Sequence, residues 1–343
     1  MKIKKGLDVS IILPFKDAQN TIVECVNSIL SQTFTNWELI AVDDSSIDQS
    51  PAILNHFSYI DSRIKLYSNP GEGIVDALNY GIAVSGSDLI ARMDSDDKMF
   101  PSRLFEQVRL FNLRKDIGLV ATLVKHVPAG SHDTRGHQNY VKWTNKIISS
   151  QDISINRFIE SPFSHPSVMF RKELISKYGG YQNGDFPEDY EMWLRFLQNH
   201  VKMEKINSVL LEWSDRGNRL SRCDPRYRLE AFQKLKAQYL KYWIESNVPP
   251  SLPIHGWGAG KFARKQIHYL REYGIRINSI YDVDFKKIRS ARNDYNVVHY
   301  NEVPQPGLCF IVVLTGGNKV RGEVNDFLVK KGYEVEKHYL HLA

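Results

Sequence analysis

The sequence predicts an α/β protein with two parts, a larger doubly wound, mostly parallel sheet followed by a smaller α/β unit. Over the first hundred residues, short β-rich runs alternate with helical patterns, which is typical of repeated βα units. Near residue 258, a glycine-rich turn separates another strand pattern from another helix, which predicts the second sheet. A chain of 343 residues with 42% hydrophobic content is long enough for about two domains.

The expected elements of the first sheet follow one another in a regular order. "VSIILPF" (9–15) predicts a buried strand, and the helix after it carries Ile22, Val26, Ile29 and Leu30 on one stripe. Further strands are expected over 37–46, 64–69 and 88–97, and helices over 20–32, 46–57 and 73–85. Ligands of doubly wound sheets bind outside the carboxyl ends of the strands, so the residues at those ends are the candidates for function.

Charge is distributed unevenly along the chain. The net charge is +6, yet residues 1–213 hold 23 Lys+Arg against 26 Asp+Glu, while residues 214–343 hold 22 against 13. The basic C-terminal surface fits a solvated face best, and an approach to anionic lipid head groups or a phosphorylated acceptor is the alternative. Because no dense basic stripe or binding motif accompanies the charge, nucleic acid is not an expected partner.

Targeting and cysteine patterns indicate a reducing cytoplasm. The apolar start is interrupted by Asp8 and Lys16, and no window approaches the roughly 18 to 20 apolar residues of a membrane span. We therefore expect neither a signal peptide nor a transmembrane helix. The three cysteines lack CxxC spacing, so they predict neither a disulfide framework nor a zinc site.

Two acidic clusters come at the predicted carboxyl ends of strands. Asp43 and Asp44 follow the second strand, and Asp94, Asp96 and Asp97 follow the fourth. Carboxylates crowded on one rim repel one another unless a cation offsets them, and such hard oxygen ligands suit Mg²⁺ or Mn²⁺. The alternative is that these aspartates only cap turns and helices. An EF-hand loop is excluded because its glycine and closing glutamate are missing.

Three segments resemble, in order, the motifs of the family 2 inverting glycosyltransferases: "VSIILPFKDAQNTIVECVNSILSQTFTNWELIAVDDSSID", "NPGEGIVDALNYGIAVSGSDLIARMDSDDKMFPSRLFEQ" and "FSHPSVMFRKELISKYGGYQNGDFPEDYEMWLRF". The resemblance covers roughly residues 8–222 and implies a nucleotide-sugar transferase fold with Mn²⁺ or Mg²⁺ at a DxD motif. It also implies an inverting hexosyltransferase that takes a sugar from a nucleotide-diphosphate donor, with UDP as the expected nucleotide. The implied acceptor is a hydroxyl of a glycan or lipid-linked saccharide in bacterial surface polysaccharide synthesis.

The resemblance assigns roles to residues of the donor site. Pro14, Phe15 and Asp17 would frame the base, and Asp44 would hydrogen-bond it. Phe15 stands where tyrosine is common in the family, which keeps the aromatic ring and loses a hydroxyl. The base is therefore the least defined part of the implied donor.

The DxD motif supplies the implied metal and diphosphate ligands. Asp96 would reach the metal and the diphosphate, Asp94 would be the supporting acid and second metal ligand, and Ser95 lies between them in the donor site. Arg92 would contact phosphate or acceptor, with a structural ion pair as the alternative. Arg216 stands near a position where many relatives have histidine, so we expect Arg216 or Arg219 to approach the diphosphate as a cation.

The implied catalytic base lies in "FPEDYEMWLRF". Glu188 and Asp189 begin a helical pattern there, and Asp189 matches the family's base, which takes a proton from the acceptor hydroxyl as that oxygen attacks the anomeric carbon. Glu188 is the second catalytic candidate, and the alternative for both acids is that they only complement the helix dipole. His165 matches a family histidine near the acceptor, with a structural hydrogen-bonded histidine as the alternative.

The C-terminal part predicts a small Rossmann-like domain. We expect the transferase domain over 1–225, a helical linker over 226–250 and the small domain over 251–343. Gly258, Gly260 and Ala263 fit GxGxxA, and Asp282 ends the next strand about where a ribose-binding acid would lie. Since glycine-rich turns also serve close packing of helix on strand, structural or oligomerisation use is favoured over nucleotide binding.

Two other functions compete with a metal-dependent glycosyltransferase. An NAD-dependent oxidoreductase would use the GxGxxA unit, but it leaves both acidic clusters unexplained. A non-catalytic sugar-nucleotide-binding scaffold would need no base at Asp189. The sequence therefore favours a cytoplasmic transferase, with peripheral contact to the inner membrane face as a further option.

Overall fold

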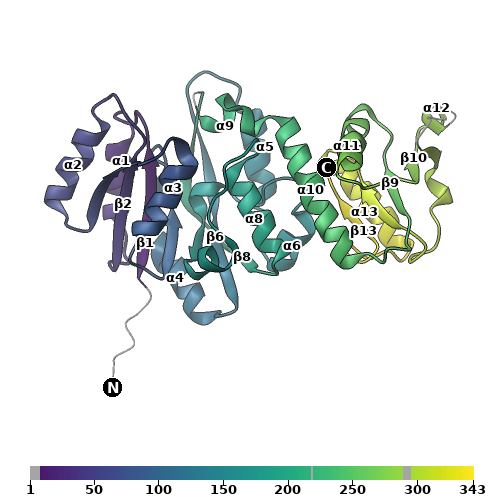
Figure 1. Ribbon diagram of the computed structural model, residues 1–343, viewed down its shortest axis with the longest axis horizontal. Helices are drawn as coiled ribbons and strands as arrows, with labels where there is room; N and C mark the ends of the chain where they lie inside the picture. The colour runs from purple at the N-terminus through teal and green to yellow at the C-terminus, as the bar shows by residue number, and fades with distance from the viewer. Residues whose placement is uncertain (1–7, 218, 289–294) are drawn as a thin grey trace. The chain divides into compact units, whose positions relative to one another are not determined.

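The computed structural model of the chain describes residues 8–217, 219–288 and 295–343 (Figure 1). The described residues divide into two compact units. The larger takes the chain up to Ile153, then Pro162–Gly184 and Glu188–Asp224; the smaller takes Ser154–Ser161, Asp185–Pro187 and Pro225–Ala343. No helix in the described residues is long and apolar enough to cross a membrane.

One eight-stranded sheet forms the larger unit, and its strands are β1 (Val9–Phe15), β2 (Trp37–Asp43), β3 (Ile64–Ser68), β4 (Leu89–Arg92), β5 (Lys98–Met99), β6 (Ile117–Ala129), β7 (Met169–Arg171) and β8 (Lys202–Arg216). Their order across the sheet is β3-β2-β1-β4-β7-β6-β8-β5. The first four strands are parallel, as are β6 and β8, whereas β7 runs antiparallel to both β4 and β6. The doubly wound, mostly parallel sheet expected from the sequence is confirmed.

The helices of the chain up to Cys223 are α1 (Ile22–Leu30), α2 (Ser50–Ile60), α3 (Gly73–Val84), α4 (Arg103–Leu113), α5 (Arg135–Thr144), α6 (Ser150–Asn156), α7 (Glu173–Tyr178), α8 (Glu188–Gln198) and α9 (Leu220–Cys223). A proline in the first turn of α2 supports its start, because proline lacks the N–H that would be unpaired there. Short 3-10 turns cover His165–Ser167 and Pro225–Tyr227.

The core of the larger unit has two layers, one on each face of the sheet. Alternate residues of β1 point to opposite faces, so Val9, Ile11 and Leu13 pack with α1, α2 and α4, while Ile12 packs with α3 and α8. Trp193 of α8 is fully buried in the second layer. Both faces are therefore covered, which leaves the ends of the strands as the place for a binding site.

The fourth strand is shorter than the sequence predicts. It was expected over 88–97, yet β4 ends at Arg92. The residues after it turn away from the sheet, where the N–H of Asp97 donates to the carbonyl of Asp94 (3.3 Å). The acidic residues consequently lie on a turn at the sheet edge rather than in a strand.

A second sheet forms the centre of the smaller unit, whose elements are α10 (Leu229–Asn247), β9 (Ile254–Trp257), α11 (Lys261–Glu272), β10 (Ser279–Asp282), α12 (Phe285–Ile288), β11 (Asn296–His299), a 3-10 turn (Tyr300–Glu302), β12 (Phe310–Val313), α13 (Asn318–Lys330) and β13 (Tyr339–His341). All its ladders are parallel, in the order β11-β10-β9-β12-β13. The chain order reverses between β9 and β12, as in other doubly wound sheets. The expected second α/β unit is confirmed as a fold.

Candidate active site

The candidate site lies in the larger unit, where three neighbouring parallel strands end. β1 is flanked by β2 and β4, with Phe15 in register with Asp43 and Ile12 with Arg92. The segments after β1, β2 and β4 therefore meet at one edge of the sheet. The predicted acidic clusters lie at the ends of β2 and β4, so the structure brings them to the two strands on either side of β1.

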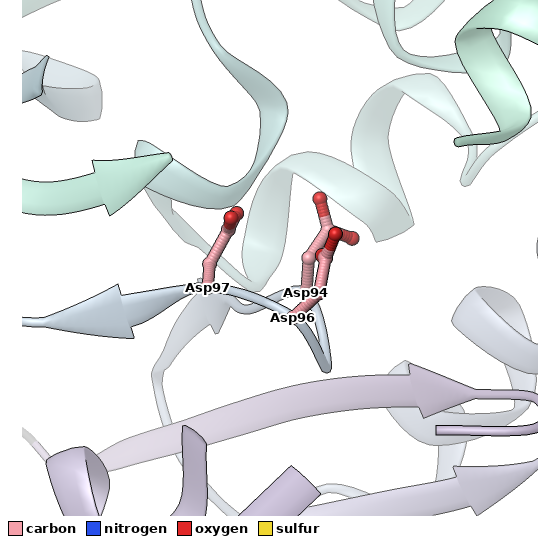
Figure 2. A group of neighbouring side chains, drawn as sticks. All are labelled: Asp94, Asp96 and Asp97. Carbon is pink, nitrogen blue, oxygen red and sulfur yellow. The ribbon is translucent and has the colours of Figure 1, made fainter. Parts of the chain in front are cut away.

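Three carboxylates gather on the turn after β4. Asp94, Asp96 and Asp97 each offer one oxygen, and these oxygens all lie within 4.8 Å of one another (Figure 2). We refer to these three residues as the acidic triplet. The sequence predicts that Asp97 belongs to the acidic cluster, but it does not predict Asp97 as a metal ligand. The structure places its carboxylate with those of the two predicted ligands.

Asp97 differs from its neighbours in being completely buried. Its Oδ1 accepts a hydrogen bond from the backbone N–H of Ser214 (2.7 Å), whereas its Oδ2 has no hydrogen-bond partner among the described residues. Burial of a carboxylate oxygen without a donor or a cation is costly. The unpartnered oxygen belongs to a group of hard oxygen donors that suits Mg²⁺ or Mn²⁺, so the residues present fit a divalent ion.

Burial and two arginines determine the charge state of the acidic triplet. Burial tends to raise the pKa of Asp94, but the charges of Arg92 and Arg219 outweigh it and hold that pKa below its usual value. Burial raises the pKa of Asp96 and that of Asp97, the latter well above its usual value, because the charge of Arg219 does not outweigh burial and the neighbouring carboxylates add to the rise. The triplet thus sets three carboxyl groups against two arginines, and Asp94 is the one whose ionised form the arginines favour most.

Arg92 is a buried member of the site. Its side chain is 3% exposed, and its Nη2 donates to Oδ1 of Asp94 (2.6 Å). The Nη1 of Arg92 also donates to the carbonyl of Met93. The predicted phosphate or acceptor contact is untested, and the ion pair offered as its alternative is present in the structure.

The predicted base-binding acids organise the loops after β1 and β2. Oδ1 of Asp44 accepts hydrogen bonds from the side-chain amide of Asn69 (2.7 Å) and the N–H of Gly73 (2.9 Å). Asp17 has a positive φ of 49°, and its Oδ1 accepts a hydrogen bond from the N–H of Ile47 (2.8 Å). Both acids therefore hold loop backbone at the edge of the sheet.

The remaining predicted donor residues differ in exposure. Pro14 is buried, and Phe15 is 3% exposed and packs within the first core layer. Ser95 is partly exposed between two members of the acidic triplet. The aromatic ring of Phe15 thus contributes to the core in this structure, and its predicted place beside the base stays a prediction.

Glu188 and Asp189 form the first turn of α8, and both interact electrostatically with Arg92. Burial, followed by the nearby charge of Glu188, raises the pKa of Asp189 to about 8, while Arg92 opposes the rise. Glu188 is 1% exposed. The charges of Asp94 and Glu188 both act on Arg92, which places the predicted base and the triplet around one cation.

His165 and Tyr181 occupy the space beside this pair of acids. Nε2 of His165 and the hydroxyl of Tyr181 are 2.8 Å apart, and the imidazole packs edge-on against Trp193. Burial, with the charge of Arg92, holds the pKa of His165 well below its usual value, so the ring is neutral. Asp189 and Asp94 both act on the Tyr181 hydroxyl, which joins this pair to the site.

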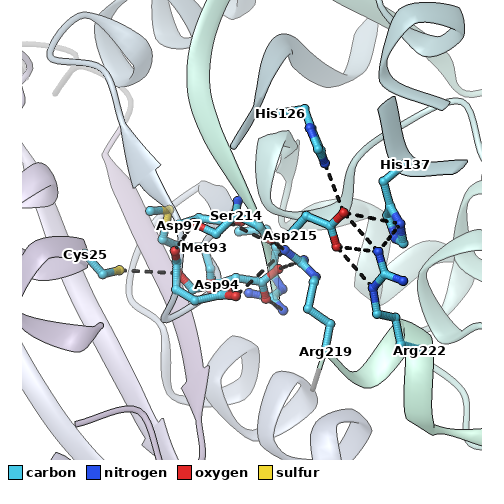
Figure 3. Close-up of polar contacts among 12 residues, drawn as sticks. Cys25, Met93, Asp94, Asp97, His126, His137, Ser214, Asp215, Arg219 and Arg222 are labelled. Atoms are coloured by element: carbon cyan, nitrogen blue, oxygen red, sulfur yellow. Dashed lines mark hydrogen bonds and ion pairs between the residues drawn. The ribbon is translucent and has the colours of Figure 1, made fainter. Parts of the chain in front are cut away.

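A polar cluster that the sequence does not predict lies at the end of β8. Asp215 is fully buried, and its carboxylate contacts Nε2 of His126 (3.0 Å), Nε2 of His132 (3.3 Å) and the Arg222 guanidinium (2.7 Å) (Figure 3). Arg222 also donates to Nδ1 of His137 (2.9 Å). Burial would raise the pKa of Asp215, but the bond from His126 and that from Arg222 lower it to about 2. Its members are spread along the chain from residue 126 to residue 222, so no local pattern in the sequence marks the cluster.

Arg216 and Arg219 are the two arginines expected near the diphosphate, and of these Arg219 makes direct contacts with the acidic triplet. Its Nη2 lies 3.2 Å from Oδ2 of Asp94, and its Nη1 lies 3.8 Å from both Oδ2 of Asp96 and Oδ1 of Asp97. Arg216 acts on Asp96 through its charge alone, and its buried Nε has no partner among the described residues. Arg219 is thus the arginine that the structure places on the acidic triplet.

The glycine-rich turn of the smaller unit is occupied by contacts of its own. Gly258 has a φ of 100°, and a Cβ there would lie 2.4 Å from Cγ2 of Thr315, so glycine is required for packing. Asp282 accepts from the N–H of Ala259 (2.7 Å) and pairs with Lys287 (3.2 Å). The carboxylate at the position of a ribose-binding acid is therefore engaged within the unit.

Comparisons with known proteins identify relatives of the chain. The sequence model of the family described as Glycosyl transferase family 2 matches residues 10–179. A UDP-Gal:alpha-D-GlcNAc-diphosphoundecaprenol beta-1,3-galactosyltransferase of Escherichia coli is 31% identical over 232 residues, covering 66% of this chain and 80% of that protein. The O-antigen biosynthesis glycosyltransferase WbnJ of Escherichia coli is 29% identical over 210 residues, covering 60% and 78%.

Solved structures agree with the fold. The crystal structure of S. aureus TarS 1-349 in complex with UDP-GlcNAc matches with a TM-score of 0.55 and 15% identity, covering 78% of this chain and 71% of that chain. At this identity, the likeness supports the architecture of the sheet and its helices alone.

Proposed function

The chain belongs to glycosyl transferase family 2, and on that premise we propose that it is a metal-dependent, inverting glycosyltransferase that moves a sugar from a UDP-sugar to an acceptor hydroxyl. The observation that carries the proposal is the acidic triplet at the strand ends, with its unpartnered oxygen on Asp97. Arg92 acts on both Asp94 of the triplet and Asp189. A divalent ion, Mn²⁺ or Mg²⁺, bound there would neutralise charge that develops on the leaving diphosphate. Asp94 and Asp96 are the proposed ligands, joined by Asp97.

In this proposal, residues at the ends of three strands, β1, β2 and β4, bind the nucleotide part of the donor. We assign the base to the loops that Asp17 and Asp44 organise, near Pro14 and Phe15. Ser95, Arg92 and Arg216 are the proposed contacts of the sugar diphosphate, because they lie on or near the acidic triplet. Cationic and hydrogen-bonding groups at this place complement the negative charge of a nucleotide diphosphate.

Asp189 is the proposed general base. Its carboxylate takes the proton of the acceptor hydroxyl while that oxygen forms a bond to the anomeric carbon, and the bond from this carbon to the diphosphate oxygen breaks. Attack from the face opposite the leaving group inverts the anomeric centre. A pKa of about 8 gives Asp189 enough basicity to accept a hydroxyl proton while part of the population stays ionised near neutral pH. Glu188 supports the base by raising its pKa.

The acceptor class comes from the relatives. The galactosyltransferase named above acts, by its name, on a diphosphoundecaprenol-linked sugar, and WbnJ is named for O-antigen biosynthesis. We therefore propose a glycan or lipid-linked saccharide of a bacterial surface polysaccharide as acceptor. The enzyme would act in the cytoplasm, with peripheral contact at the inner membrane face where such acceptors lie.

The smaller unit is proposed to serve structure or assembly. Gly258 of its GxGxxA turn is required by close packing against Thr315, and its ribose-type acid is engaged by Ala259 and Lys287, so an NAD-dependent oxidoreductase is not favoured. We keep 1–225 as the proposed transferase domain, 226–250 as the helical connection and 251–343 as the second domain.

A thermal-shift panel tests the proposal directly. UDP, GDP, CMP and NAD are each added with and without Mn²⁺, because a ligand bound only by the folded chain raises its melting temperature. We expect a shift with UDP that requires Mn²⁺, followed by transfer from a UDP-sugar detected as released UDP. A metal-independent shift with NAD alone would overturn the proposal in favour of the oxidoreductase.

A further inference from the structure

Arg219 contacts the same carboxylates that a metal ion bound to the acidic triplet would use as ligands. Its guanidinium lies 3.2 Å from Asp94 and 3.8 Å from both Asp96 and Asp97. The side chain is 12% exposed, and its guanidinium carbon stacks 4.7 Å from the centre of the Trp213 ring. One cation thus contacts all three carboxylates proposed to hold the metal. Figure 3 shows Arg219 with Asp94 and Asp97.

The charges around the acidic triplet favour an exchange of cations. Three carboxylates face two guanidinium groups, and the second of these, Arg92, contacts Oδ1 of Asp94 on its buried side. A divalent ion added to this group would leave positive charge in excess, so its affinity falls for as long as Arg219 stays on Asp96 and Asp97. The negative diphosphate of a donor is the partner that would accept the displaced guanidinium.

The backbone on both sides of Arg219 is held in place. Asp215, four residues before it, is bound by Arg222, three residues after it, at 2.7 Å. His126 and His132 contact the same carboxylate. Ser214 donates its N–H to Asp97 and its hydroxyl to the carbonyl of Asp96 (2.6 Å). The side chain of Arg219 also takes part, since its Nη1 donates to the carbonyl of Ser214. Because the other contacts hold this segment without Arg219, the guanidinium can turn between partners while its backbone stays beside the site.

We propose that Arg219 is the counter-cation of the acidic triplet before metal binding, and that it yields Asp96 and Asp97 to the divalent ion and pairs with the donor diphosphate instead. The inference rests on the proposed function and adds a role to it. Arg219 becomes a residue that makes metal and donor binding mutually dependent: the ion alone must compete with a fixed cation, whereas the ion and the diphosphate together offer that cation a new partner.

Binding of Mn²⁺, followed by the EPR signal of free Mn²⁺, tests this role without any measurement of turnover. In the absence of nucleotide, Arg219→Gln should bind Mn²⁺ about tenfold more tightly than the wild type, because a competing positive charge is removed. With Mn²⁺ saturating, the same variant should bind UDP about tenfold more weakly, because the diphosphate loses a charged donor. The two effects have opposite signs, which general damage to the site would not produce.

Two further variants separate charge from structure. Arg219→Lys keeps the positive charge, so its Mn²⁺ affinity without nucleotide should stay close to that of the wild type, even if glutamine at this position disturbs folding. Arg109→Gln removes a 56% exposed arginine of α4 that pairs with Glu106, and neither affinity should change.

The possible results distinguish the inference from the proposed function. Unchanged or weaker Mn²⁺ binding by Arg219→Gln, in a chain whose wild type binds UDP with Mn²⁺, would refute the exchange and leave the transferase intact. Tenfold tighter Mn²⁺ binding by Arg219→Lys would refute it as well, since charge would not be the cause. If the wild type binds no Mn²⁺ even with UDP, the metal-dependent function fails and the inference fails with it.

Discussion

Replacement of Asp189 by asparagine tests the proposed base most sharply. Asparagine keeps the size of the side chain and an oxygen that can accept the N–H of Tyr190 (2.7 Å), but it cannot take a proton near neutral pH. General-base catalysis typically contributes about 10²- to 10⁴-fold to the rate. We therefore expect the transfer rate of Asp189→Asn to fall by about 10³-fold while the affinity for UDP with Mn²⁺ is kept.

The raised pKa gives this prediction a pH dependence. With a pKa of about 8, the carboxylate is ionised in about a tenth of the molecules at about pH 7 and in about nine tenths at about pH 9. The kcat/KM of the wild type should thus rise about tenfold over this range, and the rise should be absent in Asp189→Asn. Initial rates of UDP release, measured at constant ionic strength, provide the profile.

Stability supplies an independent check on Asp189. Burial raises its folded-state pKa above the value near 3.8 of an unfolded chain, so its stabilising contribution is full below about pH 4 and is lost as pH rises through about 8. Asp189→Asn should therefore gain melting temperature relative to the wild type as pH increases across that window. Asp185→Asn, at an exposed position four residues earlier, should match the wild type in rate and in stability.

Two outcomes would refute this reasoning. A flat wild-type profile between about pH 7 and about pH 9 would remove a group with the pKa of Asp189 from the rate-determining step. A variant that keeps its full rate would remove Asp189 from the chemistry altogether, and Glu188 would become the acid to test next.

Three other changes test the metal site, the nucleotide loops and the core. Asp97→Asn keeps the acceptor for the Ser214 N–H but loses a charge, so Mn²⁺ affinity measured by EPR should fall about tenfold or more, and stability near neutral pH should not fall, since a buried charge is removed. Asp44→Ala leaves the N–H of Gly73 without its acceptor, so UDP affinity measured by calorimetry should drop while Mn²⁺ binding without nucleotide is unchanged. Gly81→Ala places a Cβ 2.7 Å from Cγ2 of Ile12 in a close-packed layer and should cost about 1–3 kcal/mol in denaturant unfolding.

Much of the fold could be predicted because its information is local. The strand over 9–15 coincides with β1, and the stripe of Ile22, Val26 and Ile29 is the buried face of α1. Pairings such as β7 between β4 and β6 could not be predicted, because β7 has only three residues and its antiparallel partners lie far away in the sequence. Periodicity needs more residues than that to indicate a strand.

The sequence allowed the part of the candidate site that lies in one short segment to be predicted. It did not allow prediction of contacts between residues far apart in the chain. Asp94, Asp96 and Asp97 are neighbours in sequence, so their crowding was visible as a pattern. The contact of Asp97 with Ser214 joins residues 117 positions apart. Such a contact depends on how β8 is placed beside the turn after β4. The spacing of residues along the chain does not determine that placement.

Arg92 shows why the electrostatics of the site required the structure. In the sequence it is only an arginine two residues before an aspartate, for which a phosphate contact and an ion pair were equally open. Once folded, it is 3% exposed and acts on Asp94, His165 and Asp189 together, lowering the pKa of each. One buried cation therefore favours the ionised form of an acid of the proposed metal site, adds to burial in keeping the neighbouring imidazole neutral, and opposes the rise in pKa of the proposed base. Its removal would disturb all three groups at once, so the proposed metal site and the proposed base are coupled through this one residue.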